Sequence, residues 1–368
     1  MMQWTYEMPT KIIVGKGCIG ANSQLLRAMG KKAYIITGRH SAKQSGALDA
    51  IREALKVEGI DYCVFDEIEE NPSLETLECA KNKGLEAQVD FVIGIGGGSP
   101  LDASKGIAVM LAHQELGAHN LIGDTPLDGL PVIAIPTTAG TGSEVTPYAI
   151  FTDHKAQTKR NFGHRIFPQI AYLDASYMMA MPDSVTIQTA VDAFSHLAES
   201  YLNVKSNLMS ELFVEKGIRL WADCLGALQN KTFTYEVREK LLLASTFAGM
   251  AITQTGTSLP HTMGYGLTYH KGMPHGIANA VLYGAYFRSF KDQTRVQQII
   301  EWLGLKNQEA FEETLTRLIG APDCSVTDEE IKLYTKETMV NKAKLMSHPE
   351  EVTEESIYKL YKASLKLQ

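Results

Sequence analysis

Two patterns of apolar and polar positions alternate along the first half of the chain. Short β-rich runs, several of them continuously apolar, predict strands over 11–14, 33–37, 62–65, 91–95, 132–135 and 171–173. Between them apolar residues recur at helical spacing, which predicts helices over 21–29, 46–57, 73–83 and 100–112. Continuous apolar runs are typical of strands buried on both faces. Strands that alternate with helices predict a parallel sheet with right-handed crossovers.

The pattern changes at Met181-Pro182-Asp183. Pro182 ends the preceding run, and Asp183 or Ser184 can cap a new helix. Beyond this point there is almost no strand signal, and helical spacing extends over 185–201, 208–225, 235–254 and 327–343. We therefore predict an α/β domain at 1–180 and an all-helical domain at 181–368.

Glycines and hydroxyl groups gather directly after two of the predicted strands. Residues 94–100 (GIGGGSP) follow the strand at 91–95 and open a helix, whose free N–H groups and dipole favour an anion such as a pyrophosphate. Residues 136–144 (PTTAGTGSE) follow the strand at 132–135. Ligands of open α/β sheets bind at the carboxyl ends of strands. The two loops therefore predict a site for a phosphate-bearing ligand; the alternative is a pair of turns that bind nothing.

Composition and charge argue against several classes of protein. A net charge of −7 argues against a nucleic-acid surface, and no apolar run approaches the ~20 residues of a membrane span. The five cysteines are scattered and form no C-x-x-C pair, which argues against a disulfide framework and favours a reducing cytoplasm. We expect a cytoplasmic protein with a small-molecule partner, and neither nucleic acid nor membrane as partners.

A candidate metal site begins on the predicted helix at 185–201. Asp192 and His196 lie four residues apart, which places both on one helix face, among apolar neighbours. A carboxylate oxygen beside an imidazole nitrogen suits a divalent transition metal, although an Asp–His hydrogen bond is the simpler reading. The segment 259–276 adds His261, His270 and His275. The spacing leaves open which two of these three complete the set.

Four motifs occur in order: G-G-G-S-x-x-D-x-x-K at 96–105, P-T-T-A-G-T-G-S-E-V-T at 136–146, D-A-x-x-H at 192–196 and H-x₁₃-H-G at 261–276. With them the chain resembles the iron-containing alcohol dehydrogenase family over essentially its whole length. The resemblance implies a dinucleotide-binding α/β domain followed by an all-helical metal domain, as in dehydroquinate synthase-like folds. It also implies Fe²⁺, although Zn²⁺ or another divalent ion suits the ligands, and a homodimer.

The resemblance assigns roles to individual residues. By motif match the metal ligands are Asp192, His196, His261 and His275, and His270 is not a ligand. The implied cofactor contacts are Gly97, Gly98, Ser99, Asp102, Thr137, Thr138, Thr141 and Ser143, with Asn71 and Lys159 as further contacts.

The chain departs from the family at Tyr265. Many members have a second histidine at this position, four residues after the first, and that histidine is thought to assist proton relay. A tyrosine can donate a hydrogen bond, but a phenol that ionises near pH ~10 is a poor relay at neutral pH. Tyr265 therefore fits a packing role as well as a catalytic one, and His270 is an alternative relay.

The end of the strand at 33–37 bears on the choice of dinucleotide. An acidic side chain at this place binds the ribose 2′-hydroxyl of NAD, and family members that use NAD commonly carry Asp where this chain has Gly38. Gly38 leaves space, and Arg39, Ser41 and Lys43 can bind a 2′-phosphate. We therefore expect NADP(H) rather than NAD(H).

The function expected from the resemblance is reversible hydride transfer between NADP(H) and a small alcohol or aldehyde of the butanol, 1,3-propanediol or lactaldehyde type, with the metal as Lewis acid. Alternatives within the same superfamily are a glycerol dehydrogenase, a maleylacetate reductase and a dehydroquinate synthase-like lyase. A more distant alternative is a non-catalytic protein that binds nucleotide or metal.

Overall fold

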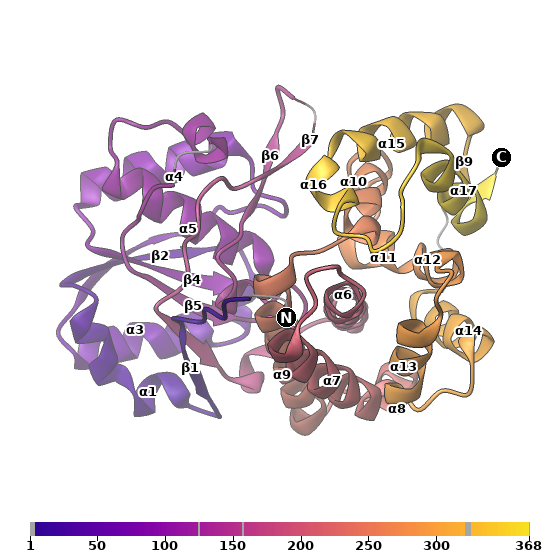
Figure 1. Cartoon of the computed structure of the whole chain (residues 1–368). Helices are drawn as coiled ribbons and strands as arrows, with labels where there is room; N and C mark the ends of the chain where they lie inside the picture. Colours follow the sequence, from indigo (N-terminus) through magenta and orange to yellow (C-terminus); the bar gives the residue numbers. More distant parts are fainter. Residues whose placement is uncertain (1–3, 124–125, 157, 321–324, 368) are drawn as a thin grey trace. The chain divides into compact units, whose positions relative to one another are not determined.

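The computed structural model describes residues 4–123, 126–156, 158–320 and 325–367. The chain divides into two compact units, which are coloured along the sequence in Figure 1. The α/β unit comprises Met8–Pro182 and Thr234–Leu242. The helical unit comprises Asp183–Phe233, the chain from Leu243 onward and the N-terminal residues up to Glu7.

A six-stranded parallel sheet forms the centre of the α/β unit, in the order β1-β8-β5-β4-β2-β3. Every strand predicted from an apolar run is present: β1 (Lys11–Val14), β2 (Lys32–Thr37), β3 (Asp61–Phe65), β4 (Phe91–Gly96), β5 (Val132–Pro136) and β8 (Ile170–Leu173). The predicted parallel sheet is therefore confirmed. Thr37 pairs with Ile95 and Gly96 with Pro136, so β2, β4 and β5 end at one edge of the sheet.

Helices cover both faces of this sheet (Figure 1). On β2, Ala33 and Ile35 belong to one buried cluster, and Tyr34 and Ile36 belong to the other. One cluster packs under α1 (Cys18–Ala21), the 3₁₀ helix Ser23–Ala28 and α3 (Ala47–Val57), and the other under α4 (Leu74–Ala87) and α5 (Gly98–Ala112). Burial on both sides explains why β2, β4, β5 and β8 are almost continuously apolar.

Two local features differ from expectation. The single helix expected over 21–29 is wrong, because α1 ends at Ala21 and the chain continues as the 3₁₀ helix from Ser23. An antiparallel hairpin of β6 (Ile150–Asp153) and β7 (Thr158–Asn161) was not expected. The shorter elements of this unit are α2 (Ser41–Gln44) and the 3₁₀ turns Ala118–Ile122, Ser143–Val145 and Ala175–Met178.

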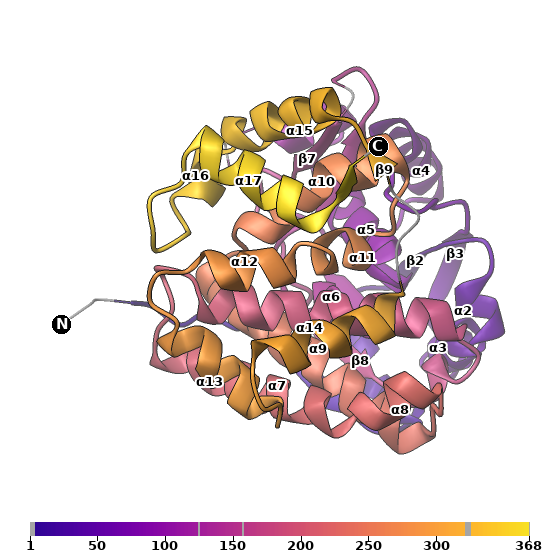
Figure 2. The same cartoon turned by 90° about the vertical axis from the view of Figure 1, so that its right-hand side faces the viewer.

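The helical unit is built around α6 (Asp183–Tyr201), in which every residue from Ala190 to Ser200 is buried. Helices α7 (Leu208–Asp223), α10 (Leu259–Lys271), α11 (His275–Ala280) and α14 (Gln308–Ile319) pack against it (Figure 2). The unit also contains α8 (Leu225–Asn230), most of α9 (Tyr235–Thr255), α12 (Tyr283–Ser289), α13 (Thr294–Trp302), α15 (Asp328–Val340), α16 (Lys342–Leu345) and α17 (Glu354–Ser364). The short strands β9 (Ser325–Val326) and β10 (Lys366–Leu367) pair in parallel.

Two wider properties also bear on the sequence analysis. None of the helices within the described residues combines the length and apolar character of a transmembrane span. Cys18, Cys63, Cys79 and Cys224 are free thiols, and Cys324 lies outside the described residues.

Candidate functional site

Helix α6 carries a polar stripe through the apolar interior of the helical unit. Asp192, His196 and Glu199 follow one another at intervals of four and three residues, so they share one helix face. Their exposed fractions are 4%, 6% and 0%. Buried groups of this kind require polar or ionic partners.

Two of the partners come from α10 and α11. His261 lies in the first turn of α10, which starts after Ser258, and His275 is the first residue of α11. A Cβ atom on Gly276 would lie 2.0 Å from the backbone oxygen of Gln188 on α6. The absence of a side chain at Gly276 therefore allows α11 to approach α6 closely enough to deliver His275.

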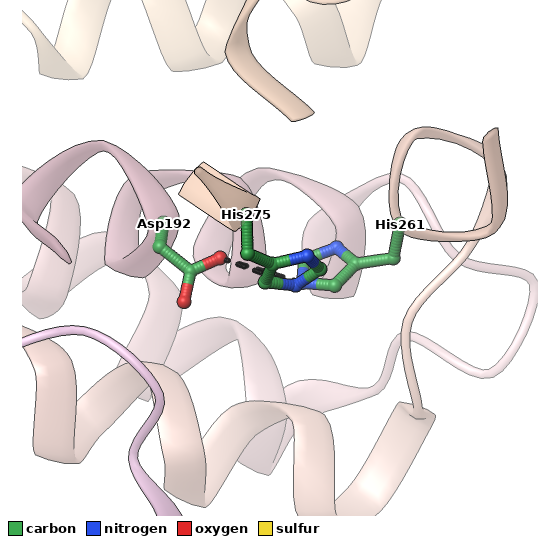
Figure 3. A group of neighbouring side chains, drawn as sticks. All are labelled: Asp192, His261 and His275. Carbon is green, nitrogen blue, oxygen red and sulfur yellow. Dashed lines mark ion pairs between the residues drawn. The ribbon is translucent and has the colours of Figure 1, made fainter. Parts of the chain in front are cut away.

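Figure 3 shows Asp192, His261 and His275 pointing toward one another. One ligand atom from each lies within 4.8 Å of the others, and the Nε2 atoms of both histidines are 3.7 Å from Oδ1 of Asp192. Atoms placed tetrahedrally about 2.1 Å from an ion are ~3.4 Å apart. The three side chains therefore fit a divalent cation.

His196 lies beside this group of three. Its ring centroid is 4.3 Å from that of His261, and its Nδ1 atom is 4.0 Å from Oδ2 of Asp192. This Nδ1 is buried and has no hydrogen-bond partner among the described residues. A buried imidazole nitrogen without a partner is costly, and a cation would satisfy it.

The electrostatics of Asp192 suit a metal ligand. Burial alone would raise the pKa of this carboxyl group, but the imidazoles of His196, His275 and His261 hold it below its ordinary value. The amide of Asn279 donates to Oδ1 of Asp192 at 3.3 Å and lies 3.3 Å from Nε2 of His275. Asp192 is thus an ionised, oriented carboxylate.

The structure also places the two residues whose roles were open. The ring of Tyr265 stacks on that of His275, with centroids 5.8 Å apart and planes inclined by 22°. His270 lies apart from the cluster, because its Nε2 is 3.0 Å from Oε1 of Glu337 and its ring stacks on Tyr334.

Glu199 is a residue of this site that the sequence analysis missed. Its Oε1 lies 2.6 Å from Nδ1 of His261, and burial raises the pKa of Glu199 to about 7, although the backbone N–H of Ser258 and the charge of Lys344 favour its carboxylate form. The available signal was its spacing, seven residues after Asp192 on the same helix.

In the α/β unit, the two glycine-rich loops lie against each other at the strand ends. A Cβ on Gly97 would lie 3.1 Å from Oγ1 of Thr138, and one on Gly98 would lie 2.7 Å from Cγ2 of Thr141. No side chain caps the N-terminus of α5, which leaves its first N–H groups to bind an anion. The hydroxyl of Thr137 is buried without a hydrogen-bond partner among the described residues.

Asp102 and Ser143 are engaged inside this unit. Ser143 donates its hydroxyl to Oδ1 of Asp102 at 2.5 Å, and the N–H of Ile150 donates to Oδ2 at 2.9 Å. The fully buried Lys105 donates to Ser143 Oγ at 2.7 Å and to the Tyr148 carbonyl at 2.6 Å. These bonds hold the loop after β5 in place. Asp102 and Ser143 therefore have a structural role, and their predicted contacts with the cofactor would be a second role.

Asn71 joins the loops to the β6–β7 hairpin. Its backbone, at φ 56, donates its N–H to Ser99 Oγ at 3.0 Å, and its side-chain oxygen accepts from Lys159 Nζ at 2.8 Å. Thr152 donates its hydroxyl to the Asn71 carbonyl at 2.7 Å. Three of the predicted contacts, distant in sequence, are thus brought together.

The segment after β2 contains exposed basic side chains. Arg39 and Ser41 are exposed, Gly38 is half-buried, and no ion pair of Arg39 occurs within the described residues. Lys43 is exposed too, but its Nζ lies 2.6 Å from Oδ2 of Asp66, which lowers the pKa of that carboxyl group. Asp66 therefore already balances the charge of Lys43.

Comparison with known proteins identifies two matching family profiles and a similar enzyme. The profile described as iron-containing alcohol dehydrogenase matches residues 9–175, and that of the C-terminal domain of the Fe-containing alcohol dehydrogenase family matches residues 186–365. A 1,3-propanediol dehydrogenase of Klebsiella pneumoniae is 30% identical over 370 residues, covering 94% of this chain and 93% of its own.

A further enzyme and a solved structure are also similar to this chain. An NADPH-dependent butanol dehydrogenase of Clostridium saccharobutylicum is 30% identical over 305 residues, covering 81% of this chain and 76% of its own. The crystal structure of an iron-containing alcohol dehydrogenase from Thermotoga maritima superposes with a TM-score of 0.92 at 34% identity, covering 99% of both chains.

Proposed function

Because this chain belongs to the iron-containing alcohol dehydrogenase family, we propose that it transfers a hydride reversibly between NADP(H) and a small alcohol or aldehyde. The observation that carries the proposal is the convergence of Asp192, His261 and His275, whose ligand atoms lie within 4.8 Å of one another. Asp192 and His261 are buried and His275 is half-buried, and the three come from three different helices to within reach of one ion.

Asp192, His196, His261 and His275 would hold a divalent metal. The family favours Fe²⁺, and the oxygen and nitrogen ligands also suit Zn²⁺ or another divalent ion. When bound, the ion supplies Lewis-acid polarisation of the substrate oxygen.

The chain's own residues prepare this site. Asp192 brings a negative charge into the buried site, and Asn279 orients its Oδ1 by donating a hydrogen bond. Tyr265 holds the plane of the His275 ring by stacking on it. We assign Tyr265 this packing role first, and its hydroxyl can in addition act as a hydrogen-bond donor.

The loops of the α/β unit would bind the dinucleotide. Gly97, Gly98 and Ser99 at the start of α5 would present backbone N–H groups to its phosphates. Further contacts are proposed for Asn71, Asp102, Thr137, Thr138, Thr141, Ser143 and Lys159. When bound, the dinucleotide would supply the hydride chemistry, and these residues would orient it.

The preference for NADP(H) rests on the segment after β2. Gly38 presents no carboxylate that would repel a 2′-phosphate, and Arg39 and Ser41 are exposed donors. Lys43 contributes less, because Asp66 pairs with it. Steady-state kinetics with NADPH and NADH test this: we expect the higher kcat/KM with NADPH, and a strong preference for NADH would refute it.

Metal analysis combined with a panel of aldehydes tests the function as a whole. We expect about one divalent ion per chain and reduction of short aldehydes, with butanal, 3-hydroxypropanal and lactaldehyde as the first candidates. Loss of the ion to a chelator should abolish turnover, and its return should restore turnover. Full turnover by metal-depleted protein would contradict the proposal.

We also propose that the protein is a cytoplasmic homodimer. Free thiols at Cys18, Cys63, Cys79 and Cys224 suit a reducing compartment, and family members commonly form dimers. Light scattering of the purified protein tests the assembly, and a monomeric mass would refute it.

A further inference from the structure

We propose that Glu199 is a positioning residue for the metal: it holds the His261 proton on Nδ1, so that the lone pair of Nε2 faces the cation site. The inference rests on the proposed function, in that it assumes a cation between Asp192, His261 and His275. It assigns a role to a buried carboxylate that contacts no cation itself.

The carboxylate of Glu199 is completely buried, and both of its oxygens accept hydrogen bonds. Oε2 accepts from the backbone N–H of Ser258 at 2.5 Å, and Oε1 lies 2.6 Å from Nδ1 of His261. The hydroxyl of Tyr283 donates to Oε1 at 3.2 Å. These partners come from the start of α10 and from α12, so Glu199 connects three helices at the back of the cluster.

This arrangement determines the tautomer of His261. A carboxylate only accepts hydrogen bonds, so the ring nitrogen facing Oε1 must carry the proton. The other ring nitrogen, Nε2, is then deprotonated, and it is the atom that lies 3.7 Å from Oδ1 of Asp192. Metal-binding histidines generally donate their second N–H to a carboxylate or carbonyl group, which fixes the ring and raises its basicity.

Lys344 completes the charge balance. It is half-buried near Glu199, and its Nζ donates to the hydroxyl of Thr257. Its positive charge, like that of a divalent ion on the far side of His261, would attract the acceptor oxygens of Glu199.

Glu199→Gln is the sharp test, because it changes hydrogen-bonding capacity with little change in shape. The Ser258 N–H can only donate, so the amide oxygen of glutamine must face it. The amide NH₂ then faces Nδ1 of His261 and turns that nitrogen into an acceptor. The proton moves to Nε2, and the ligand lone pair is lost.

Tyr283→Phe is the matched control. It removes the other side-chain donor to Oε1 while it keeps the carboxylate and the contact with His261. Glu199→Asp is the conservative variant, because it keeps the charge and both acceptor oxygens.

The experiment measures Co²⁺ affinity of the full chain by competition with a chelator, and the tautomer of His261 by ¹⁵N NMR of the metal-free protein. We expect Glu199→Gln to weaken Co²⁺ binding about 10- to 100-fold and to place the proton on Nε2. Glu199→Asp should recover part of the affinity, and Tyr283→Phe should stay close to wild type. Equal loss in Tyr283→Phe and Glu199→Gln would show a general packing effect and overturn the proposal.

Wild-type protein provides a test even if Glu199→Gln does not fold. A His261 proton on Nε2 in metal-free wild type would overturn the proposal directly. The proposed function can fail separately from the positioning role. If the wild-type protein binds Co²⁺ tightly but reduces no aldehyde, the proposed dehydrogenase activity is refuted. If the wild type is active and the Glu199→Gln variant binds Co²⁺ equally well, only the positioning role is refuted.

Discussion

The candidate sites of the two units are built in different ways. In the helical unit, side chains from α6, α10 and α11 converge, and each contributes a particular atom. In the α/β unit, two loops contribute mainly backbone, and the missing side chains of Gly97 and Gly98 allow the loops to approach each other. The site of the helical unit depends on which side chains are present, and the site of the α/β unit depends on how closely the two loops can approach each other. Substitutions should therefore affect them differently.

Removal of a metal ligand should have the largest effect. Asp192→Ala or His275→Ala should remove the bound metal and lower kcat/KM about a thousandfold or more, because Lewis-acid stabilisation contributes several kcal/mol. Metal content and aldehyde reduction are measured on the same preparation. His270→Ala is the control, since His270 pairs with Glu337 away from the cluster. Stoichiometric metal in Asp192→Ala would contradict the assigned site.

The Gly276→Ala variant tests whether the metal site of the helical unit depends on the close approach of α11 to α6. Its Cβ would meet a backbone oxygen of α6 at 2.0 Å, which cannot yield unless a helix moves. Overpacking of roughly 1–3 kcal/mol should weaken metal affinity about 10- to 100-fold. Gly226→Ala on α8, where a Cβ meets nothing within 4 Å, is the control. Equal metal affinity in both variants would mean that α11 does not need this close approach.

Gly98→Ala makes the same change in the other unit, with a smaller effect. Its Cβ would meet the Thr141 methyl group at 2.7 Å, and that side chain can rotate. We expect KM for the dinucleotide to rise roughly tenfold or less while metal content stays unchanged. Gly20→Ala, with open space around the new Cβ, is the control. Loss of metal in Gly98→Ala would contradict the independence of the two sites.

The smallest effect concerns Lys105, which supports the loop after β5. Burial lowers the pKa of Lys105 to about 8 from 10.5, although Asp102 and Glu144 favour its charged form. Between these two pH values the unfolded chain binds more protons at this site than the folded chain, so Lys105 makes stability rise with pH there. In Lys105→Met that contribution should be absent. Urea unfolding followed from pH 7.5 to 10.5 tests this, and parallel curves for the two proteins would refute it.

Most of the sheet was predictable because burial on both faces leaves β2, β4, β5 and β8 almost continuously apolar. The β6–β7 hairpin was not, because its strands have four residues each and include polar side chains such as Thr152 and Lys159. The error at 21–29 has a local cause. The side chain of Asn22 donates to the Cys18 carbonyl, and such bonds compete with a continuing helix.

Part of the metal site could also be predicted from the sequence. Asp192 and His196 share one helix, so their relation is visible in a spacing of four. The choice among His261, His270 and His275 depends on how α10 and α11 pack, and spacing left it open; resemblance to a family made that choice. Glu199 was missed because a glutamate on a helix usually faces water, and its complete burial is a property of the packing.

The distances along the chain between Asp192, His261 and His275 have a consequence for synthesis in the cell. Asp192 leaves the ribosome more than eighty residues ahead of His275, so at first only the Asp192–His196 pair is available to an ion. The proposed set of ligands would be complete only once α11 has docked on α6. Metal loading by this set would therefore follow the folding of this part of the chain.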